Sequence, residues 1–210
     1  MPPFDRFSAV AAVLDAPNID TDIIFPARFL LLLDRDGLGK HAFEDRRLDR
    51  AGAEDPSFVL NQPAFRDARI LVGGPNFGCG SSREHAVWAL HDRGISCVVA
   101  PSFGEIFFNN CLRNAVLPIV LADAEWQRVR AHAVTAAPVT VDLPNQSIQL
   151  GDQPPIPFDI APERREALLN GQDDIATILD QCGPAMGAFE QRRRQSHPWL
   201  FASGNNGQGN

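Results

Sequence analysis

The sequence predicts an α/β protein whose centre is a parallel β-α-β-α-β unit. Three short apolar runs support this prediction, because each is rich in aliphatic residues and two of them lead directly into helix-forming segments. We expect strands at 68–72, 96–100 and 116–121, and intervening helices at 82–93 and 103–113. Short connections between alternating strands and helices require parallel strands joined by right-handed crossovers.

Further elements flank this centre along the chain. Alternating residues predict an early strand at 7–10, and short polar side chains predict a loop at 18–26. The charged region that follows has little periodicity, with room for short helices near 41–47. Gly94 is expected to end the helix before it, and Asp123 to cap the next one. The later segments predict, in order, a helix at 123–133, a β-hairpin at 138–143 and 147–150, and helices at 163–169 and 173–181.

Composition bounds the domain organisation and the possible partners. The chain has 210 residues, 44% of them hydrophobic, enough for a single domain at 1–190 with a buried core. Residues 191–210 are basic and then rich in Gly, Asn and Gln, which predicts a disordered tail. The net charge of −7 argues against nucleic acid or an anionic membrane as the main partner.

The chain also lacks the sequence features of a membrane or secreted protein. Its longest apolar run, near 29–33, is far shorter than the ~20 residues that span a bilayer. We find no signal peptide, and the four cysteines show no CxxC spacing. We therefore expect a cytoplasmic protein with reduced thiols and no membrane contact.

Residues 76–85, Asn-Phe-Gly-Cys-Gly-Ser-Ser-Arg-Glu-His, are the most informative stretch of the chain. Placed at the entrance of a helix, they combine unpaired backbone N–H groups with a positive helix dipole, which favours anions. Ser81 and Ser82 can donate or accept hydrogen bonds, and Arg83 offers a planar fork that matches a carboxylate. The stretch therefore predicts a carboxylate or phosphate site with a serine that could exchange a proton.

A purely structural alternative exists for the same residues. Ser81 and Glu84 have the spacing of a capping box, and Ser102 and Glu105 repeat it. A capping box requires neither the preceding glycines nor Arg83, and these favour the functional interpretation.

Three other functions fit the residues less well. Hydrolysis with Cys79 or Ser81 as nucleophile and His85 as base lacks a Gly-x-Ser-x-Gly elbow and a suitable spacing. A phosphate-binding module lacks the Gly-x-x-x-x-Gly-Lys-Ser/Thr pattern. A binding module without catalysis would leave the dense polar cluster unexplained.

Four more segments join the stretch at 78–85 in one family pattern. They are Asn-Ile-Asp-Thr-Asp-Ile-Ile-Phe-Pro at 18–26, Phe-Val-Leu-Asn-Gln-Pro at 58–63, the segment 100–111, and Leu-Leu-Asn-Gly-Gln-Asp-Asp-Ile at 168–175. From about residue 7 to residue 193 the chain resembles the small subunits of 3-isopropylmalate dehydratase, in the aconitase superfamily. The resemblance implies a swivelling β/β/α domain like the mobile C-terminal domain of aconitase.

The resemblance also implies a reaction and a partner. The reaction is the isomerisation of 2-isopropylmalate to 3-isopropylmalate by dehydration and rehydration, in leucine biosynthesis. A separate large subunit is expected to carry a [4Fe–4S] cluster, with no metal or cofactor in this chain, whose cysteines are not clustered. A related hydro-lyase subunit, acting on homoaconitate or a citramalate-type acid, is the alternative.

Within the resemblance, Ser81 is the base that removes the proton next to a carboxylate. Ser82 and Arg83 hold a substrate carboxylate, while Thr21 and Asp22 lie across the mouth of the site and are expected to bind the substrate there. A turn held by Asx hydrogen bonds is an additional role for those two.

Leu31 and Leu32 are expected to receive the alkyl group of the substrate, since an arginine there would suit an extra carboxylate. Their alternative role is ordinary core packing. Cys79 is interpreted as a small residue in a tight bend and His85 as a locally packed residue, whereas His41 has no companion motif.

Overall fold

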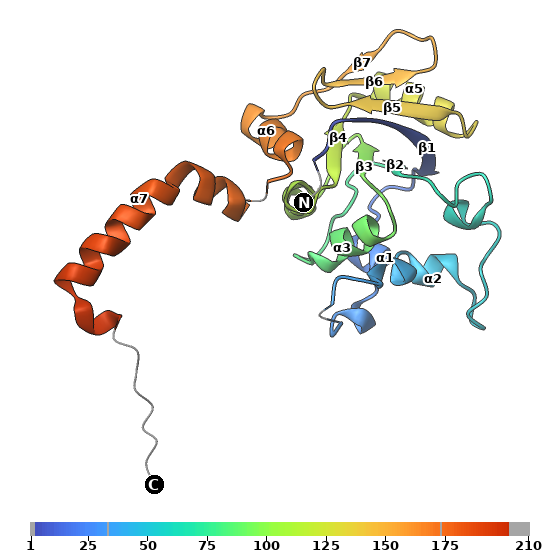
Figure 1. Cartoon of the computed structure of the whole chain (residues 1–210). Coiled ribbons are helices and arrows are strands. Elements are labelled where there is room, and N and C mark those ends of the chain that lie inside the picture. The colour runs from blue at the N-terminus through green and yellow to red at the C-terminus, as the bar shows by residue number, and fades with distance from the viewer. Residues whose placement is uncertain (1–2, 33, 173, 202–210) are drawn as a thin grey trace. The chain divides into compact units, whose positions relative to one another are not determined.

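A seven-stranded mixed sheet with the order β4-β3-β2-β1-β5-β6-β7 forms the centre of the unit that ends at residue 173 (Figure 1). The computed structural model describes residues 3–32, 34–172 and 174–201. The strands are β1 (Arg6–Leu14), β2 (Ile70–Gly73), β3 (Cys97–Ala100), β4 (Leu117–Val120), β5 (Pro138–Asp142), β6 (Ser147–Leu150) and β7 (Ile156–Pro157).

β2, β3 and β4 confirm the predicted parallel centre, and β1 joins it in parallel beside β2, which was not predicted. β1 to β4 pair in parallel, with Ala11 opposite Ile70 and Ile70 opposite Cys97. β5, β6 and β7 extend the sheet in antiparallel fashion from the other edge of β1. The hairpin of β5 and β6 is as predicted, whereas β1 is longer than the expected 7–10 and β7 was not predicted.

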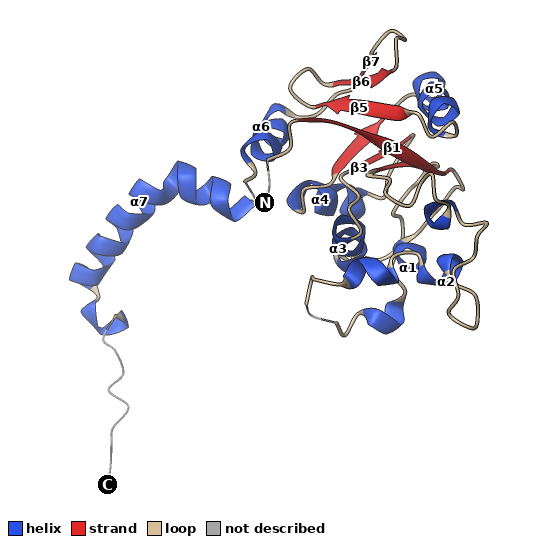
Figure 2. Ribbon diagram, turned by 45° about the vertical axis from the view of Figure 1, so that its right-hand side comes forward, coloured by secondary structure: helices blue, strands red, loops and turns tan. Residues whose placement is uncertain are grey.

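Helices cover both faces of this sheet (Figure 2). They are α1 (Thr21–Ile24), α2 (Glu44–Arg47), α3 (His85–Asp92), α4 (Glu105–Arg113), α5 (Asp123–Ala133) and α6 (Pro162–Asn170), with 3₁₀ turns η1 (Ala27–Phe29), η2 (Leu38–His41) and η3 (Val59–Asn61). Neighbouring strand residues point to opposite faces, so Ile70 and Val72 join the core under α5, and Leu71 joins the core under α3. Both faces of the parallel centre are therefore buried, as its continuous apolar runs require.

The structure corrects two predicted helix boundaries and confirms a third. α3 begins at His85, three residues later than the expected start at 82, and Glu84 is its N-cap. Ala122 is the N-cap of α5, so Asp123 is its first helical residue and not its cap. Gly94 does follow the end of α3, with a φ of +94°, and its N–H donates to the His91 carbonyl at 2.8 Å.

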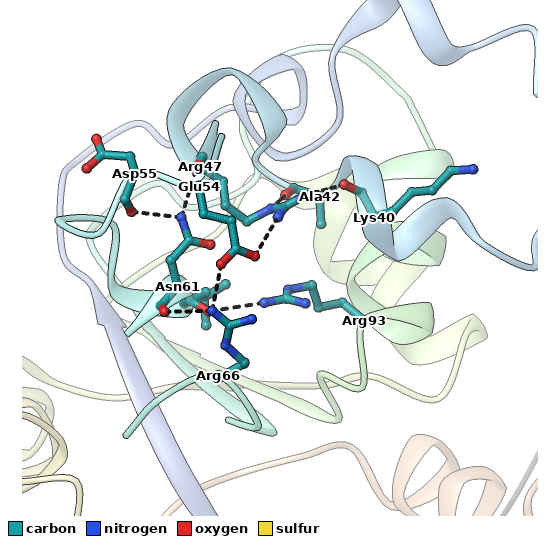
Figure 3. Close-up of polar contacts among 9 residues, drawn as sticks. Lys40, Ala42, Arg47, Glu54, Asp55, Asn61, Arg66 and Arg93 are labelled. Atoms are coloured by element: carbon teal, nitrogen blue, oxygen red, sulfur yellow. Dashed lines mark hydrogen bonds and ion pairs between the residues drawn. The ribbon is translucent and has the colours of Figure 1, made fainter. Parts of the chain in front are cut away.

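A polar network fixes the irregular chain between η2 and β2 (Figure 3). The buried Arg47 donates to the carbonyls of Lys40 and Ala42, and Asn61 Nδ2 donates to the Arg47 carbonyl at 2.7 Å. Arg66 pairs with Glu54 at 2.6 Å. Because these contacts satisfy backbone groups that no strand or helix uses, a segment of low periodicity keeps one conformation.

The chain divides into two units, Met1–Asp173 and Asp174–Asn210. In the second, α7 (Asp174–Ser196) is one helix with Pro184 inside it, followed by the turn η4 (Pro198–Leu200). The predicted helix at 173–181 therefore continues through the expected domain boundary at 190, and residues 191–196 are helical. Disorder after residue 201 stays a prediction, because residues 202–210 lie outside the described part. Within that part, no helix is both long and apolar enough to cross a membrane.

Candidate active site

The loops that follow β2 and β3 are joined edge to edge. Phe77 N–H donates to the Ser102 carbonyl at 3.0 Å, and Gly104 N–H donates to the Phe77 carbonyl at 2.9 Å. Both loops leave the carboxyl ends of parallel strands, the edge at which open α/β sheets form their sites.

The loop after β1 is bonded to the other side of the same segment. Gly78 N–H donates to the Ile19 carbonyl at 2.7 Å, and Thr21 N–H donates to the Cys79 carbonyl at 2.9 Å. The Thr21 hydroxyl also donates to the Ser81 carbonyl at 3.2 Å. The loops after β1 and β3 thus hold residues 77–81, which belong to the loop after β2, from both sides.

Gly78 lets this segment pass close to α4. Its φ is +71°, and a methyl group on its Cα would lie 2.1 Å from the Phe107 ring. Beside it, a cavity of about 200 Å³ is lined by the glycine-rich segment and the start of α4: Gly78, Cys79, Gly80, Ser81, Gly104, Glu105, Ile106 and Phe107. Only glycine combines this backbone conformation with so close an approach.

Ser81 lies on the rim of this cavity and does not cap a helix. Both Ser81 and Ser82 are exposed, and in the described structure no side chain caps α3, whose N-cap is Glu84. The second serine of this spacing, Ser102, accepts a hydrogen bond from Asn76 N–H at 2.8 Å and also leaves its helix uncapped. The capping-box alternative is therefore wrong at both positions.

Arg83 and Asp22 form an ion pair across the site. Their side chains are 22% and 51% exposed, so the pair faces solvent while the Arg83 stem packs against the protein. α1 and α3 are in contact, which brings these residues together although 61 positions separate them in sequence. The structure thus places Thr21, Asp22 and Arg83 around Ser81, as the sequence predicts.

Asn114 is a residue of this region that sequence reasoning missed. Its amide donates to Glu84 Oε1 at 2.7 Å, and its oxygen accepts from Trp88 Nε1 at 3.0 Å. His85 stacks on Phe25, with ring centroids 5.9 Å apart, and also contacts Trp88. These contacts give His85 the packing role that we expected and anchor the start of α3. No spacing in the sequence links Asn114 to the motif.

Leu31 and Leu32 are exposed, by 90% and 41% respectively. Core packing, the alternative role for these leucines, is therefore wrong. Neither lines the cavity beside Ser81. They follow η1, which begins directly after the buried Phe25 and Pro26.

The thiols in the described part of the chain do not form a metal-binding group. Burial and the nearby Asp20 carboxylate raise the pKa of Cys79, and burial raises the pKa of Cys97 and Cys111 as well. Neutral thiols are poor ligands and poor nucleophiles. Over the described residues, no three His, Cys, Asp or Glu side chains group closely enough to bind a metal ion. The donor set therefore does not fit an iron–sulfur cluster, which requires three or four thiolates.

Comparison with known proteins first gives the class. Residues 1–124 match the sequence profile of the aconitase C-terminal domain, and residues 184–203 match the C-terminal domain of the 3-isopropylmalate dehydratase small subunit. The chain is thus an aconitase C-terminal-like α/β domain, which confirms the predicted fold class.

Individual relatives give the family. The 3-isopropylmalate dehydratase small subunit of Rhodospirillum centenum is 51% identical over 203 residues, covering 96% of this chain and 100% of the relative. That of Paramagnetospirillum magneticum is 50% identical, covering 95% and 100%. A solved 3-isopropylmalate dehydratase from Methanocaldococcus jannaschii has a TM-score of 0.64 and 25% identity, covering 87% of this chain and 99% of that one. The chain belongs to the 3-isopropylmalate dehydratase small subunits, hydro-lyase subunits of leucine biosynthesis.

Proposed function

We propose that this chain supplies one wall of an active site that isomerises 2-isopropylmalate to 3-isopropylmalate, completed by a large subunit. The observation that carries the proposal is the position of Ser81. It is exposed at the rim of a cavity, its carbonyl accepts from the Thr21 hydroxyl, and it lies two positions before Arg83 in the sequence.

Ser81 acts in this proposal as the base that removes and returns a proton next to a substrate carboxylate. A serine hydroxyl is a weak base at neutral pH, so its surroundings must stabilise the alkoxide. The positive charge of Arg83 has the required sign. The contribution of the helix dipole is smaller than the sequence suggests, because α3 begins four residues beyond Ser81.

Arg83 and Ser82 bind the carboxylate in this proposal. The contact with Asp22 uses the Nη1 side of the guanidinium. The remaining N–H groups can therefore meet a substrate carboxylate with the paired geometry that arginine favours. Asp22 keeps the fork oriented at the mouth of the site while no substrate is bound.

Thr21 contributes by holding the loop. It is only 1% exposed and its hydroxyl already donates to the Ser81 carbonyl, so its role is to position Ser81. This differs from the direct substrate contact that the sequence predicts for it. Leu31 and Leu32, which are exposed, are proposed to receive the isopropyl group once the large subunit encloses the substrate.

The large subunit is proposed to bring the [4Fe–4S] cluster, because the described residues of this chain offer no ligand set for one. When bound there, the cluster would supply the Lewis acid for the leaving hydroxyl. We propose the cytoplasm as the location, since all four cysteines are free thiols, as a reducing compartment would keep them.

Co-expression with a large subunit tests the function. The two chains should co-purify, and the complex should convert 2-isopropylmalate, whereas this chain alone should contain no stoichiometric iron and show no turnover. A brown cluster in the isolated chain, or an inactive complex with an intact cluster, would contradict the proposal.

Substrate preference tests the alternative of a related hydro-lyase. The complex should prefer 2-isopropylmalate to homoaconitate, because a carboxylate beside Leu31 and Leu32 would lose its water without gaining a partner. Leu31→Arg should reduce activity with the first substrate more than with the second. Preference for homoaconitate in the unmodified complex would favour the alternative.

A further inference from the structure

The loop that carries Leu31 and Leu32 is held by its own backbone hydrogen bonds and by contacts with the core. Two successive turns shape it: Leu30 N–H donates to the Ala27 carbonyl at 3.1 Å, and Leu32 N–H donates to the Phe29 carbonyl at 3.0 Å. Since Leu31 is 90% exposed, its own side chain cannot fix the loop. The half-buried Phe29 and Leu30 are the residues of these turns that pack against the core.

Phe29 rests on His41, a residue to which the sequence assigns no role. The two rings stack with centroids 3.8 Å apart and planes 23° apart. The Arg28 guanidinium also lies 4.5 Å from the centroid of the Phe29 ring. Phe25, fully buried, contacts both Phe29 and His41 and ties the stack to the core.

Glu44 joins the two sides of this stack. One of its carboxylate oxygens lies 2.5 Å from His41 Nδ1, and the other accepts from Arg28 Nη2 at 2.9 Å. Asp45 pairs with the other end of the Arg28 guanidinium at 2.7 Å. Burial works against the charge of Glu44, yet the hydrogen bonds from His41 and Arg28 lower its pKa, so the carboxylate stays ionised and holds both partners.

The support under His41 is itself rigid. Gly39, in the same turn η2, donates its N–H to Asp92 Oδ2 at 2.6 Å. A methyl group on Gly39 would lie 2.6 Å from the Arg93 backbone nitrogen, so η2 packs directly on the end of α3. The other end of α3 adjoins Arg83 and Ser81. One helix therefore connects the support of the leucine loop with the catalytic loop.

We infer that His41 and Glu44 are positioning residues for substrate specificity: they hold Phe29 and Arg28, and thereby place Leu31 and Leu32 against the alkyl group. The inference rests on the proposed role of the two leucines. It predicts that a loosened support impairs recognition of the isopropyl group more than catalysis in general.

The test uses the reconstituted two-subunit enzyme and two substrates, 2-isopropylmalate and the smaller 2-methylmalate. The measured quantity is the ratio of kcat/KM for 2-isopropylmalate to kcat/KM for 2-methylmalate. His41→Ala should lower this ratio at least about fourfold, the factor that corresponds to the ~0.8 kcal/mol of one buried methylene. His41→Phe, which retains a stacking ring, should keep the ratio within about twofold of the unmodified enzyme.

Two further variants separate positioning from general stability. Glu44→Gln removes the ionised partner that Arg28 and His41 share, so that Arg28 keeps only Asp45, but leaves the His41 ring in place. It should lower the ratio even if His41→Ala fails to assemble. Arg66→Gln removes the ion pair of Arg66 with Glu54, whose length is similar to that of the Arg28–Glu44 pair. This pair includes neither Phe29 nor the leucines. This control should leave the ratio unchanged.

Leu31→Ala tests the apolar wall, meaning the surface that Leu31 and Leu32 are proposed to present to the alkyl group. It therefore distinguishes failure of this inference from failure of that proposal. If Leu31→Ala lowers the ratio and neither His41→Ala nor Glu44→Gln does, the wall stands and the positioning role is refuted. If none of the three changes the ratio in an active enzyme, the wall fails and the inference with it. Equal ratios for His41→Ala and His41→Phe would also contradict the stack as the positioning contact.

Discussion

Gly78→Ala should destabilise the protein through two separate effects. The φ of +71° disfavours any residue with a Cβ, at a cost of about 1–2 kcal/mol. The new methyl group would also lie 2.1 Å from the Phe107 ring, which is 2% exposed and packs on Phe77 and Phe103. Because that ring cannot move into solvent, overpacking should add about 1–3 kcal/mol.

Gly52→Ala is the matched control. Gly52 has a φ of +82°, but no atom lies within 4 Å of its added methyl group, so only the conformational cost of about 1–2 kcal/mol applies. Urea unfolding of the isolated chain measures the free energy of unfolding of both variants. Thermal unfolding should show a Tm difference of about 2–4 °C per kcal/mol. Equal destabilisation of the two variants would refute the close approach of Gly78 to α4.

Three further predictions concern single side chains of the first unit, Met1–Asp173. Cys79→Ser should retain most of the activity of the two-subunit enzyme, because its raised pKa leaves a neutral thiol; loss of all turnover would restore a chemical role for the sulfur. Arg83→Lys should raise KM several-fold, since lysine keeps the charge and loses the fork, and unchanged kinetics would remove Arg83 from the carboxylate site. Hydrogen bonds from the Asn145 side chain and N–H lower the pKa of Asp142 below 3.8, so its stabilising effect is present above that pH and lost as the pH falls through the lowered pKa. The stability difference between the unmodified chain and Asp142→Asn should accordingly shrink below pH 3.8, and a difference independent of pH would contradict this.

The parallel centre could be predicted because its strands are buried on both faces. The side chains of Ile70, Leu71 and Val72 point alternately into the two cores, so the run is continuously apolar. Such a run can be recognised as a buried strand from the sequence alone. β7, in contrast, has only two residues, one of them a proline, and leaves no pattern. Its pairing with β6 depends on a tertiary contact.

Local signals were less reliable at the site itself. The serine–glutamate spacing is typical of a capping box, yet the Ser102 hydroxyl binds Asn76 N–H instead, and Ser81 lies outside the helix. α1 was expected to be a loop because a helix of four residues has too few positions to show a period. Asp20 does cap it, accepting from Ile23 N–H at 2.7 Å. The proximity of Asp22 to Arg83 came from family resemblance alone, because no local pattern relates residues 61 positions apart.

A pair of serine variants tests the central claim, that Ser81 acts in catalysis and not in folding. Ser81→Ala should lower kcat of the two-subunit enzyme by about 10²–10⁴-fold, while its stability changes by no more than about 0.5 kcal/mol. Ser102→Ala should do the opposite: it loses the bond to Asn76, costs about 1 kcal/mol, and keeps most of the activity. Near-normal kcat in Ser81→Ala, with the stable complex intact, would contradict the account.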